Sequence, residues 1–325
     1  MKILVINPGG IGDVLLFTPA LRVLREEFPG VRIDVLLVQK APAEFLDPKL
    51  ADKIIIHSLK DGFFKTLKLI LQLRKERYDI SIVSAGVNPS KSRVLAFLTG
   101  ARKKLREPSP INTSWHEIDA NISILRAGGM RAEPSLKYPV LALSKEQLQF
   151  AEEFIKTNNL TGRTLIAFHP GSSQTQSVKR WPKEYFIELG KKILSSFPKA
   201  EIFIVGEPRE KDICLEIQNA LKERSLLVVE YSLKRVAALL AASKAFVGGD
   251  SGIAHIAAAV QIKTIVLFGP TDPKRTSPRG PHVFIIQEHC SKMATSPRYP
   301  YQGPHQCMKR ITSKMVLEEL TRGVF

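Results

Sequence analysis

The stretch Ile3-Leu4-Val5-Ile6-Asn7-Pro8-Gly9-Gly10-Ile11-Gly12-Asp13 joins an apolar run of four residues to a glycine-rich turn that carries one acid. A periodic apolar segment follows, and this order predicts the first βα unit of a parallel sheet. Ligands bind beyond the carboxyl ends of the strands in such sheets, where Asp13 is expected. Its carboxylate is a candidate general base, or else it only complements the helix dipole. Leu15 occupies the third glycine position of a dinucleotide fingerprint, so no such cofactor site is predicted.

The length and composition of the chain favour a two-domain globular protein. Its 325 residues are 44% hydrophobic and 24% charged, which is typical of soluble proteins. No apolar run approaches the roughly 20 residues that span a bilayer. Lys2 precedes only four apolar residues, so we expect no signal peptide and a cytoplasmic location. The three cysteines are too widely spaced to predict a disulfide framework or a zinc knuckle.

The net charge of +17 is unevenly distributed along the chain. Residues 60–106 hold twelve basic and three acidic side chains. Such a local excess attracts an anionic partner, which could be nucleic acid, a membrane surface or a phosphorylated substrate, unless it is only a solvated surface. No nucleic-acid-binding module is recognisable, so nucleic acid is not the predicted partner.

Strand and helix patterns alternate in two consecutive series. The first predicts strands at 3–6, 33–38, 53–56, 80–84 and 103–105, with helices at 13–27, 62–77, 90–99 and 116–127. The second predicts strands at 165–168, 201–205, 227–230, 245–247, 264–268 and 283–286, with helices at 183–196, 209–222, 233–243 and 252–260. A capping-box pattern at Ser144-x-Glu146-Gln147 opens another helix. We therefore predict two doubly wound α/β domains facing each other, 1–143 and 144–325, with the last helix from about 313 packing back on the first.

Polar turns follow several predicted strands of the second series. Gly248-Gly249-Asp250-Ser251-Gly252 opens a helix of small residues, and amides at such a helix start bind phosphate, although Asp250 could simply cap the helix. His169-Pro170-Gly171-Ser172 and Lys179-Arg180 follow an earlier strand and offer a second phosphate contact. An acid in Gly206-Glu207-Pro208-Arg209-Glu210 could accept hydrogen bonds from ribose hydroxyls.

The sequence offers no familiar divalent-metal motif for a site of this kind. There is no D-x-D pair, and the seven histidines lack the short spacings of a zinc site. We therefore predict no metal and no cofactor, so helix amides, hydroxyls and Lys179 would meet the charge of a leaving diphosphate. The chain also lacks a Walker sequence.

Four segments together resemble a known enzyme family over essentially the whole chain. They are Gly10-Ile11-Gly12-Asp13 with Thr18-Pro19-Ala20-Leu21, Lys179-Arg180-Trp181-Pro182, Asp250-Ser251-Gly252-x-x-His255, and Leu267-Phe268-Gly269-Pro270-Thr271. They occur in the order found in ADP-heptose:lipopolysaccharide heptosyltransferases, glycosyltransferase family 9. The resemblance implies a GT-B fold of two Rossmann-like domains across a cleft, the first binding the acceptor and the second the nucleotide sugar. It also implies inverting, metal-independent transfer.

The resemblance further implies a role for each matching residue. Asp13 corresponds to the general base that deprotonates the acceptor hydroxyl. On the donor side, Ser172 and Lys179 match positions that contact the diphosphate, and Ser251 and Gly252 match the helix-start amides. Asp250 matches a position beside the donor sugar, with His255 behind it. Glu210 matches the ribose contact and is slightly preferred over Glu207. The chain departs from relatives that carry a Cys-x-x-Cys-type cluster, because only Cys290 and Cys307 remain here.

The implied acceptor is a lipopolysaccharide precursor whose inner core is rich in phosphates and carboxylates. We expect Gly10 and Gly12 to allow its close approach, and Arg93, Arg102, Lys103 and Arg106 to contact its anionic groups. The apolar and basic segment 63–71 predicts either an interfacial helix at the inner face of the inner membrane or, as favoured, a crossover helix buried against the sheet. The alternative functions are a GT-B transferase or epimerase that uses a UDP- or GDP-linked sugar, and a basic nucleic-acid-binding protein.

Overall fold

The chain divides into two compact units in the computed structural model. The structure describes residues 1–58, 61–86, 89–107, 114–172, 174–288, 290 and 305–323. One unit comprises Met1–Leu141 with Lys274–Thr276, and the other comprises Ala142–Pro273 with Ser277–Phe325.

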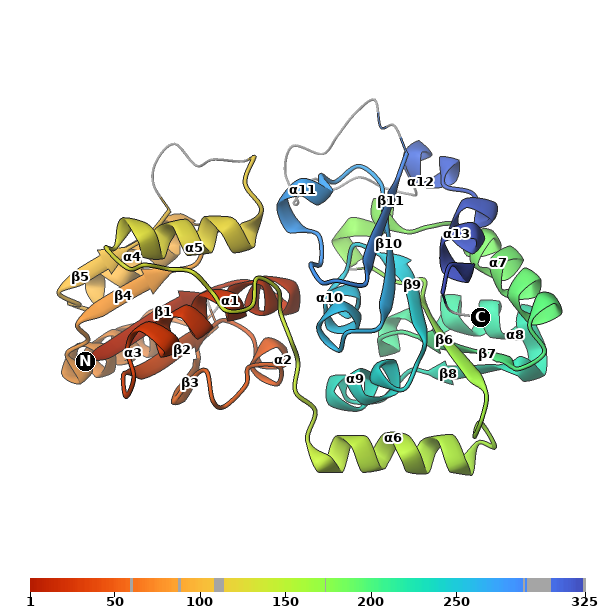
Figure 1. The fold of residues 1–325 in the computed structure, drawn as a ribbon. Coiled ribbons are helices and arrows are strands. Elements are labelled where there is room, and N and C mark those ends of the chain that lie inside the picture. Colours follow the sequence, from red (N-terminus) through yellow and green to blue (C-terminus); the bar gives the residue numbers. More distant parts are fainter. Residues whose placement is uncertain are drawn as a thin grey trace. The chain divides into compact units, whose positions relative to one another are not determined.

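The first unit is a five-stranded parallel sheet covered by helices (Figure 1). Its elements are β1 (Lys2–Asn7), α1 (Ile11–Glu27), β2 (Arg32–Leu37), α2 (Lys40–Ala43), β3 (Lys53–Ile56), α3 (Phe63–Glu76), β4 (Ile80–Val83), α4 (Pro89–Leu98), β5 (Lys103–Leu105) and α5 (Glu117–Ala127). The strand order is β3-β2-β1-β4-β5, so the chain winds outward from β1 in both directions. This is the doubly wound topology that the alternating pattern predicts.

The alternation of side chains along β1 explains why both faces of this sheet are covered. Ile3 and Val5 belong to the core cluster that α1 and α5 complete. Leu4 and Ile6 point to the opposite face and belong to the cluster completed by α3 and α4. A strand buried on both faces must be apolar at every position, which is why its sequence is a continuous run.

Helix α3 uses only part of its apolar surface to pack on the sheet. Leu69 and Leu73 are buried, whereas Phe63 is 75% exposed and Phe64 is 83% exposed. The favoured interpretation of segment 63–71 as a buried crossover helix therefore holds for only one face of α3. A second face, rich in aromatic and basic side chains, is exposed to solvent.

The second unit is a six-stranded parallel sheet with helices on both faces (Figure 1). Its elements are α6 (Lys145–Thr157), β6 (Thr164–His169), α7 (Lys183–Ser196), β7 (Ala200–Val205), α8 (Lys211–Leu221), β8 (Ser225–Val228), α9 (Leu233–Ala241), β9 (Ala245–Gly249), α10 (Gly252–Ala259), β10 (Lys263–Phe268), α11 (Pro273–Thr276), β11 (Val283–Gln287), α12 (Gln306–Arg310) and α13 (Ser313–Thr321). Short 3-10 turns lie at Gln174–Lys179, Pro208–Glu210 and Lys222–Arg224. The order β11-β10-β9-β6-β7-β8 again grows outward from the first strand.

Both ends of this unit show how local sequence sets its helices. The capping box predicted at the start of α6 is present, with Ser144 and Gln147 each accepting a backbone N–H of the other. At the far end, Val316 and Leu320 of α13 are buried in the core that α7 and α8 share. The apolar face of α13 is therefore used within the second unit.

The two predicted α/β domains are confirmed, with small differences at element ends. The strand predicted at 227–230 lies at Ser225–Val228, and the short helix α2 was not predicted. In the part of the chain that the structure describes, no helix is both long and apolar enough to cross a membrane.

Candidate active site

Each sheet has a switch point, where the chain begins to wind in the opposite direction. In the first unit it lies between β1 and β4, and in the second between β6 and β9. A crevice opens at the carboxyl ends of the two strands at such a point, and ligands of doubly wound proteins bind there. The predicted turns after β1 and after β9 both lie at a switch point.

The turn after β1 holds Asp13 through the backbone. Asp13 occupies the third position of α1, and its Oδ2 accepts a hydrogen bond from the Gly10 N–H at 2.7 Å. Asn7 stabilises the same turn. Its Oδ1 accepts a hydrogen bond from the Gly9 N–H at 3.0 Å, and its Nδ2 donates to the Asp13 carbonyl at 3.2 Å. A Cβ added to Gly9 would lie 2.2 Å from the Asp13 Cβ, so only glycine fits there. Asp13 therefore does cap its helix, and capping fixes its carboxylate at the switch point.

A second carboxyl group, which the sequence analysis missed, lies near Asp13. Glu117 at the start of α5 is 3% exposed, and its Oε1 has no hydrogen-bond partner among the described residues. Burial, together with the negative charge of Asp13, raises the pKa of Glu117 well above its usual value. An acid in a first helical turn ordinarily serves the helix dipole, so sequence alone gives no signal of this burial.

The predicted acceptor residues separate into two groups. Gly10, the N-cap of α1, and Gly12, in its first turn, lie just before Asp13, and Arg106 directly follows the carboxyl end of β5. Arg93, on the helix that follows β4, is half-buried.

Arg102 and Lys103 lie instead at the amino end of β5, the opposite edge of the sheet. Arg102 pairs with Asp79 at 3.7 Å, and the Lys103 Nζ donates to the Gly128 carbonyl at 2.5 Å. The structure therefore does not bring these two residues to the Asp13 turn.

An apolar cavity lies beside the Asp13 turn in the first unit. Its volume is about 360 Å³, and it reaches from Pro8 to side chains of α3 and α4. Its lining includes Ile6, Ile70, Val94 and Leu95. Val94 is 60% exposed, so the cavity adjoins the exposed apolar side chains of the two helices.

In the second unit, the turn after β9 presents the start of α10. Ser251 is the N-cap, and its Oγ accepts the Ala254 N–H at 3.4 Å. The same Oγ lies 3.2 Å from the Nδ1 of His169 at the end of β6. His169 pairs with Gly248 in the sheet register, which explains why residues far apart in sequence meet. The amides of Gly252 and its neighbours thus begin the helix at this switch point.

Lys179 and Asp250 form a nearly buried ion pair at the same place. The Lys179 Nζ donates to Asp250 Oδ2 at 2.6 Å, with side-chain exposures of 10% and 9%. The Thr271 hydroxyl donates to the same oxygen at 3.2 Å. Thr271 belongs to a segment that the sequence analysis quoted without giving it a role. A cation next to helix-start amides is suited to bind a diphosphate.

Glu210 completes a chain of polar contacts behind Ser251. Its Oε2 lies 3.4 Å from His169 Nε2 and accepts the Glu207 N–H at 2.9 Å. Burial opposes its ionisation, but these contacts outweigh burial and lower the pKa of Glu210. The Glu207 carboxylate instead pairs with Arg209 at 2.6 Å on the surface. Of the two candidate acids, Glu210 is therefore the one that lies with the other polar groups.

The two remaining predicted donor residues are buried nearby. The Ser172 hydroxyl accepts from Arg180 Nε at 3.1 Å, which ties the turn after β6 to the Lys179-Arg180 segment. His255 lies in α10 and is 6% exposed. The structure therefore brings together all the residues predicted for the donor side.

Two Rossmann-like domains, each with a polar turn at its switch point, are the architecture found in GT-B glycosyltransferases. Residues 66–300 match the model of "Glycosyltransferase family 9 (heptosyltransferase)". The chain belongs to that family, so the resemblance noted in the sequence is confirmed and the protein is a glycosyltransferase.

Full-length relatives support this assignment. The chain is 29% identical to lipopolysaccharide heptosyltransferase 2 of Salmonella typhimurium, covering 98% of this chain and 97% of the relative. It is 26% identical to lipooligosaccharide heptosyltransferase 2 of Campylobacter jejuni, covering 99% of both chains. The solved structure of E. coli ADP-heptose lps heptosyltransferase II matches with a TM-score of 0.80 at 25% identity, covering 100% of this chain and 98% of that one.

Proposed function

We propose that this chain transfers a heptose from ADP-heptose to the inner-core (Kdo/heptose) region of a lipopolysaccharide precursor. We further propose that the transfer inverts the anomeric carbon and needs no catalytic metal ion. The names of the full-length relatives support the donor and acceptor classes. The observation that carries the proposal is the ion pair of Lys179 with Asp250 at the start of α10, a site suited to a nucleotide diphosphate.

The second domain would bind the donor through its diphosphate. The first amides of α10 and the Ser251 hydroxyl would donate to phosphate oxygens, and Lys179 would neutralise their charge. Asp250 would then lie beside the donor sugar, with His255 behind, and Glu210 would accept from the ribose. Because the sequence has no D-x-D pair, we assign the stabilisation of the leaving diphosphate to these amides and cations.

The first domain would supply the base. Asp13 would take the proton of the acceptor hydroxyl as that oxygen attacks the anomeric carbon, and attack opposite the leaving diphosphate inverts that centre. Positioned proton transfer of this kind contributes about 10²–10⁴-fold to rate. Gly10 and Gly12 would allow close approach of the acceptor, and Arg93 and Arg106 are the remaining candidates for its anionic groups.

We propose that the enzyme acts at an anionic membrane surface. Exposed apolar side chains on α3 and α4 adjoin the apolar cavity, with Phe64 83% and Phe97 71% exposed. Lys65 and Lys68 lie among the apolar residues of α3, and such a combination favours anionic lipid interfaces. Liposomes with and without anionic lipid, compared for Phe64→Ser and for the native chain, test this location. Equal binding to neutral and anionic liposomes would contradict it.

The function is tested by supplying a matched set of donors with a Kdo-containing acceptor. We expect turnover with ADP-heptose, no stimulation by added Mg²⁺ or Mn²⁺, and a product whose anomeric configuration, read by NMR, is opposite to that of the donor. Turnover only with a UDP- or GDP-linked sugar would retain the enzyme class but contradict the proposed donor. Retention of configuration would exclude Asp13 as the base of a direct displacement.

A thermal-shift series separates the remaining alternatives. We expect ADP to stabilise the chain more than UDP or GDP, and a short DNA duplex to have no effect. Stabilisation by DNA alone, falling steeply with salt, would instead support the nucleic-acid alternative.

A further inference from the structure

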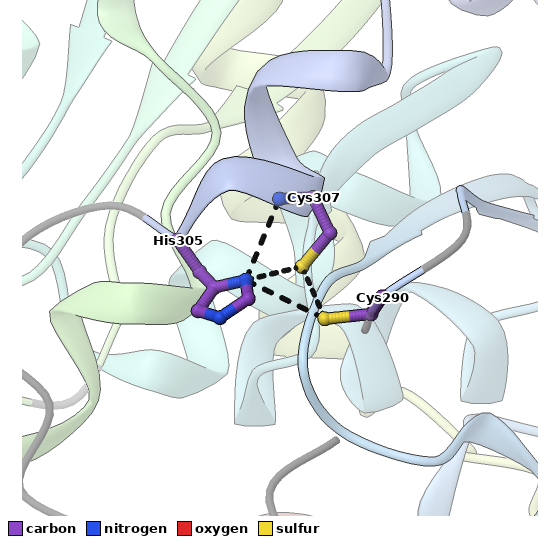
Figure 2. Close-up of side chains that lie close together, drawn as sticks. All are labelled: Cys290, His305 and Cys307. Atoms are coloured by element: carbon purple, nitrogen blue, oxygen red, sulfur yellow. Dashed lines mark hydrogen bonds between the residues drawn. The ribbon is translucent and has the colours of Figure 1, made fainter. Parts of the chain in front are cut away.

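Three side chains of the types that bind metal ions meet where the last strand of the second domain leads to its last two helices. Figure 2 shows Cys290, shortly after β11, facing His305 and Cys307 at the start of α12. The Cys307 Sγ lies 2.8 Å from the Cys290 Sγ and 2.8 Å from the His305 Nδ1. The Cys290 Sγ lies 3.4 Å from the same nitrogen. All three donor atoms therefore face one point.

The donor set and its spacing suit a tetrahedral metal ion. Bonds of about 2.3 Å to sulfur and about 2.0 Å to nitrogen separate tetrahedral ligand atoms by about 3.5–3.8 Å. The three donors need to spread by only about 1 Å to reach this spacing. Two sulfurs and one imidazole are ligands that zinc prefers, and Cys290 and Cys307 are not joined in a disulfide.

We propose that Cys290, His305 and Cys307 bind one thiolate-preferring divalent metal ion, for which zinc is the best match. Zinc with two thiolates and a neutral imidazole carries no net charge, so it is unsuited to neutralise a diphosphate. The fourth tetrahedral position would take water or another donor. We therefore assign the ion a structural role, distinct from the metal-independent transfer proposed above.

The position of the cluster shows what the ion would stabilise. The His305 N–H donates to the carbonyl of Val178, the residue before Lys179, at 3.3 Å. A Cβ added to Gly269 would lie 2.5 Å from Met308 Sδ and 3.6 Å from Cys307 Sγ. Gly269 lies two residues before Thr271 in the turn after β10. The cluster therefore packs against the segments that carry Lys179 and Thr271, the two partners of Asp250. A bound ion would fix α12 against this donor-side machinery.

Metal analysis of the purified full-length chain tests the site. After reconstitution with Zn²⁺ and removal of excess metal, we expect about one ion per chain by elemental analysis. Cys290→Ser and Cys307→Ser should each lose most of it. Cys214→Ala is the matched control, because Cys214 is a free cysteine buried in α8, apart from the cluster, and this variant should keep its metal. Cobalt substitution should give intense thiolate-to-metal absorption in the native chain and in Cys214→Ala only.

Several results would overturn the proposal. These are less than a tenth of an ion per native chain, equal metal content in Cys290→Ser and the native chain, or a Cys290–Cys307 disulfide in the protein as purified. Circular dichroism of each variant separates loss of the site from loss of the fold. Because metal content is measured without donor or acceptor, failure of the proposed transferase activity leaves this test intact.

Discussion

The turns after β1 and β9 share a sequence pattern but hold their acids in different ways. Both lie at a switch point after a buried strand, and two adjacent glycines precede each acid, in the turn itself after β1 but at the end of the strand in β9. Asp13 lies inside its helix and accepts a backbone N–H from Gly10. Asp250 precedes its helix and accepts from the Lys179 ammonium and the Thr271 hydroxyl.

This difference suggests a division of chemical labour. A carboxylate held by a backbone amide keeps a fixed position, which suits a group that must take a proton. A carboxylate paired with an ammonium holds that cation in place next to helix-start amides, which suits phosphate binding. We infer that the position of the acid relative to its helix decides which role each turn has.

The largest expected effect comes from Asp13→Asn. The amide oxygen can still accept from the Gly10 N–H, so the fold should persist while the proposed base is lost. We expect kcat to fall by about 10²–10⁴-fold. Steady-state kinetics with saturating donor measure this, and a kcat within threefold of the native value would remove Asp13 from the chemistry.

The next largest effect is expected when the Lys179–Asp250 ion pair of the second domain is broken. Lys179→Met leaves Asp250 nearly buried without its cation, so we expect a loss of about 3–5 kcal/mol in the free energy of unfolding. Lys183→Met is the matched control, since Lys183 and its partner Glu216 have side-chain exposures of 37% and 53%, and it should change little. Urea denaturation without ligand measures both variants, and equal losses would contradict the assignment.

A pair of glycine variants tests whether the position of Asp13 matters. Gly9→Ala must displace Asp13, whereas a Cβ at Gly10 would lie 3.6 Å from its Oδ2, an ordinary contact. We expect Gly9→Ala to lower kcat by about 10²-fold, as for a 1 Å misplacement of a catalytic group. Gly10→Ala should act mainly on the KM of the acceptor. A native kcat in Gly9→Ala would contradict the claim that catalysis depends on the fixed position of Asp13.

The smallest effect concerns Glu117. Its folded-state pKa is raised, so between the unfolded value of 4.5 and the folded value the native chain binds more protons than the unfolded chain. The stabilising contribution is complete below about pH 4.5 and is lost as the pH rises through the folded pKa.

Glu117→Gln removes this titration. Relative to the native chain, the variant should gain stability progressively from pH 5 to pH 8, by about 1.4 kcal/mol for each unit by which folding raises the pKa of Glu117 across this range. Thermal melts across this range measure the difference, with the exposed Glu152→Gln as control. A difference independent of pH would show that Glu117 does not titrate in this way.

The sequence predicts the two domains and nearly every strand, because buried parallel strands leave continuous apolar runs such as Ile3–Ile6. It also predicts that the donor-side candidates lie together, since most of them follow a strand and parallel strands end at one edge of the sheet. It does not reveal that Arg102 and Lys103 lie at the amino end of β5, because a run of basic residues does not show which end of a short strand they occupy. Glu117 is missed because its burial depends on tertiary packing.

The cysteine cluster illustrates the same limit. Cys290 and Cys307 are far apart in sequence, and only the spacing of His305 and Cys307 hints at a shared site. Their meeting depends on how β11 and α12 are arranged, which no local pattern encodes.

The dissociation constant of ADP, measured by calorimetry for the native chain, Asp13→Asn and Lys179→Met, tests the division of labour most directly. We predict that Asp13→Asn binds ADP within about twofold of the native chain. We predict that Lys179→Met binds it about 10–100-fold more weakly, the range for losing one charged hydrogen bond. Equal weakening in both variants, or native affinity in Lys179→Met, would contradict the account.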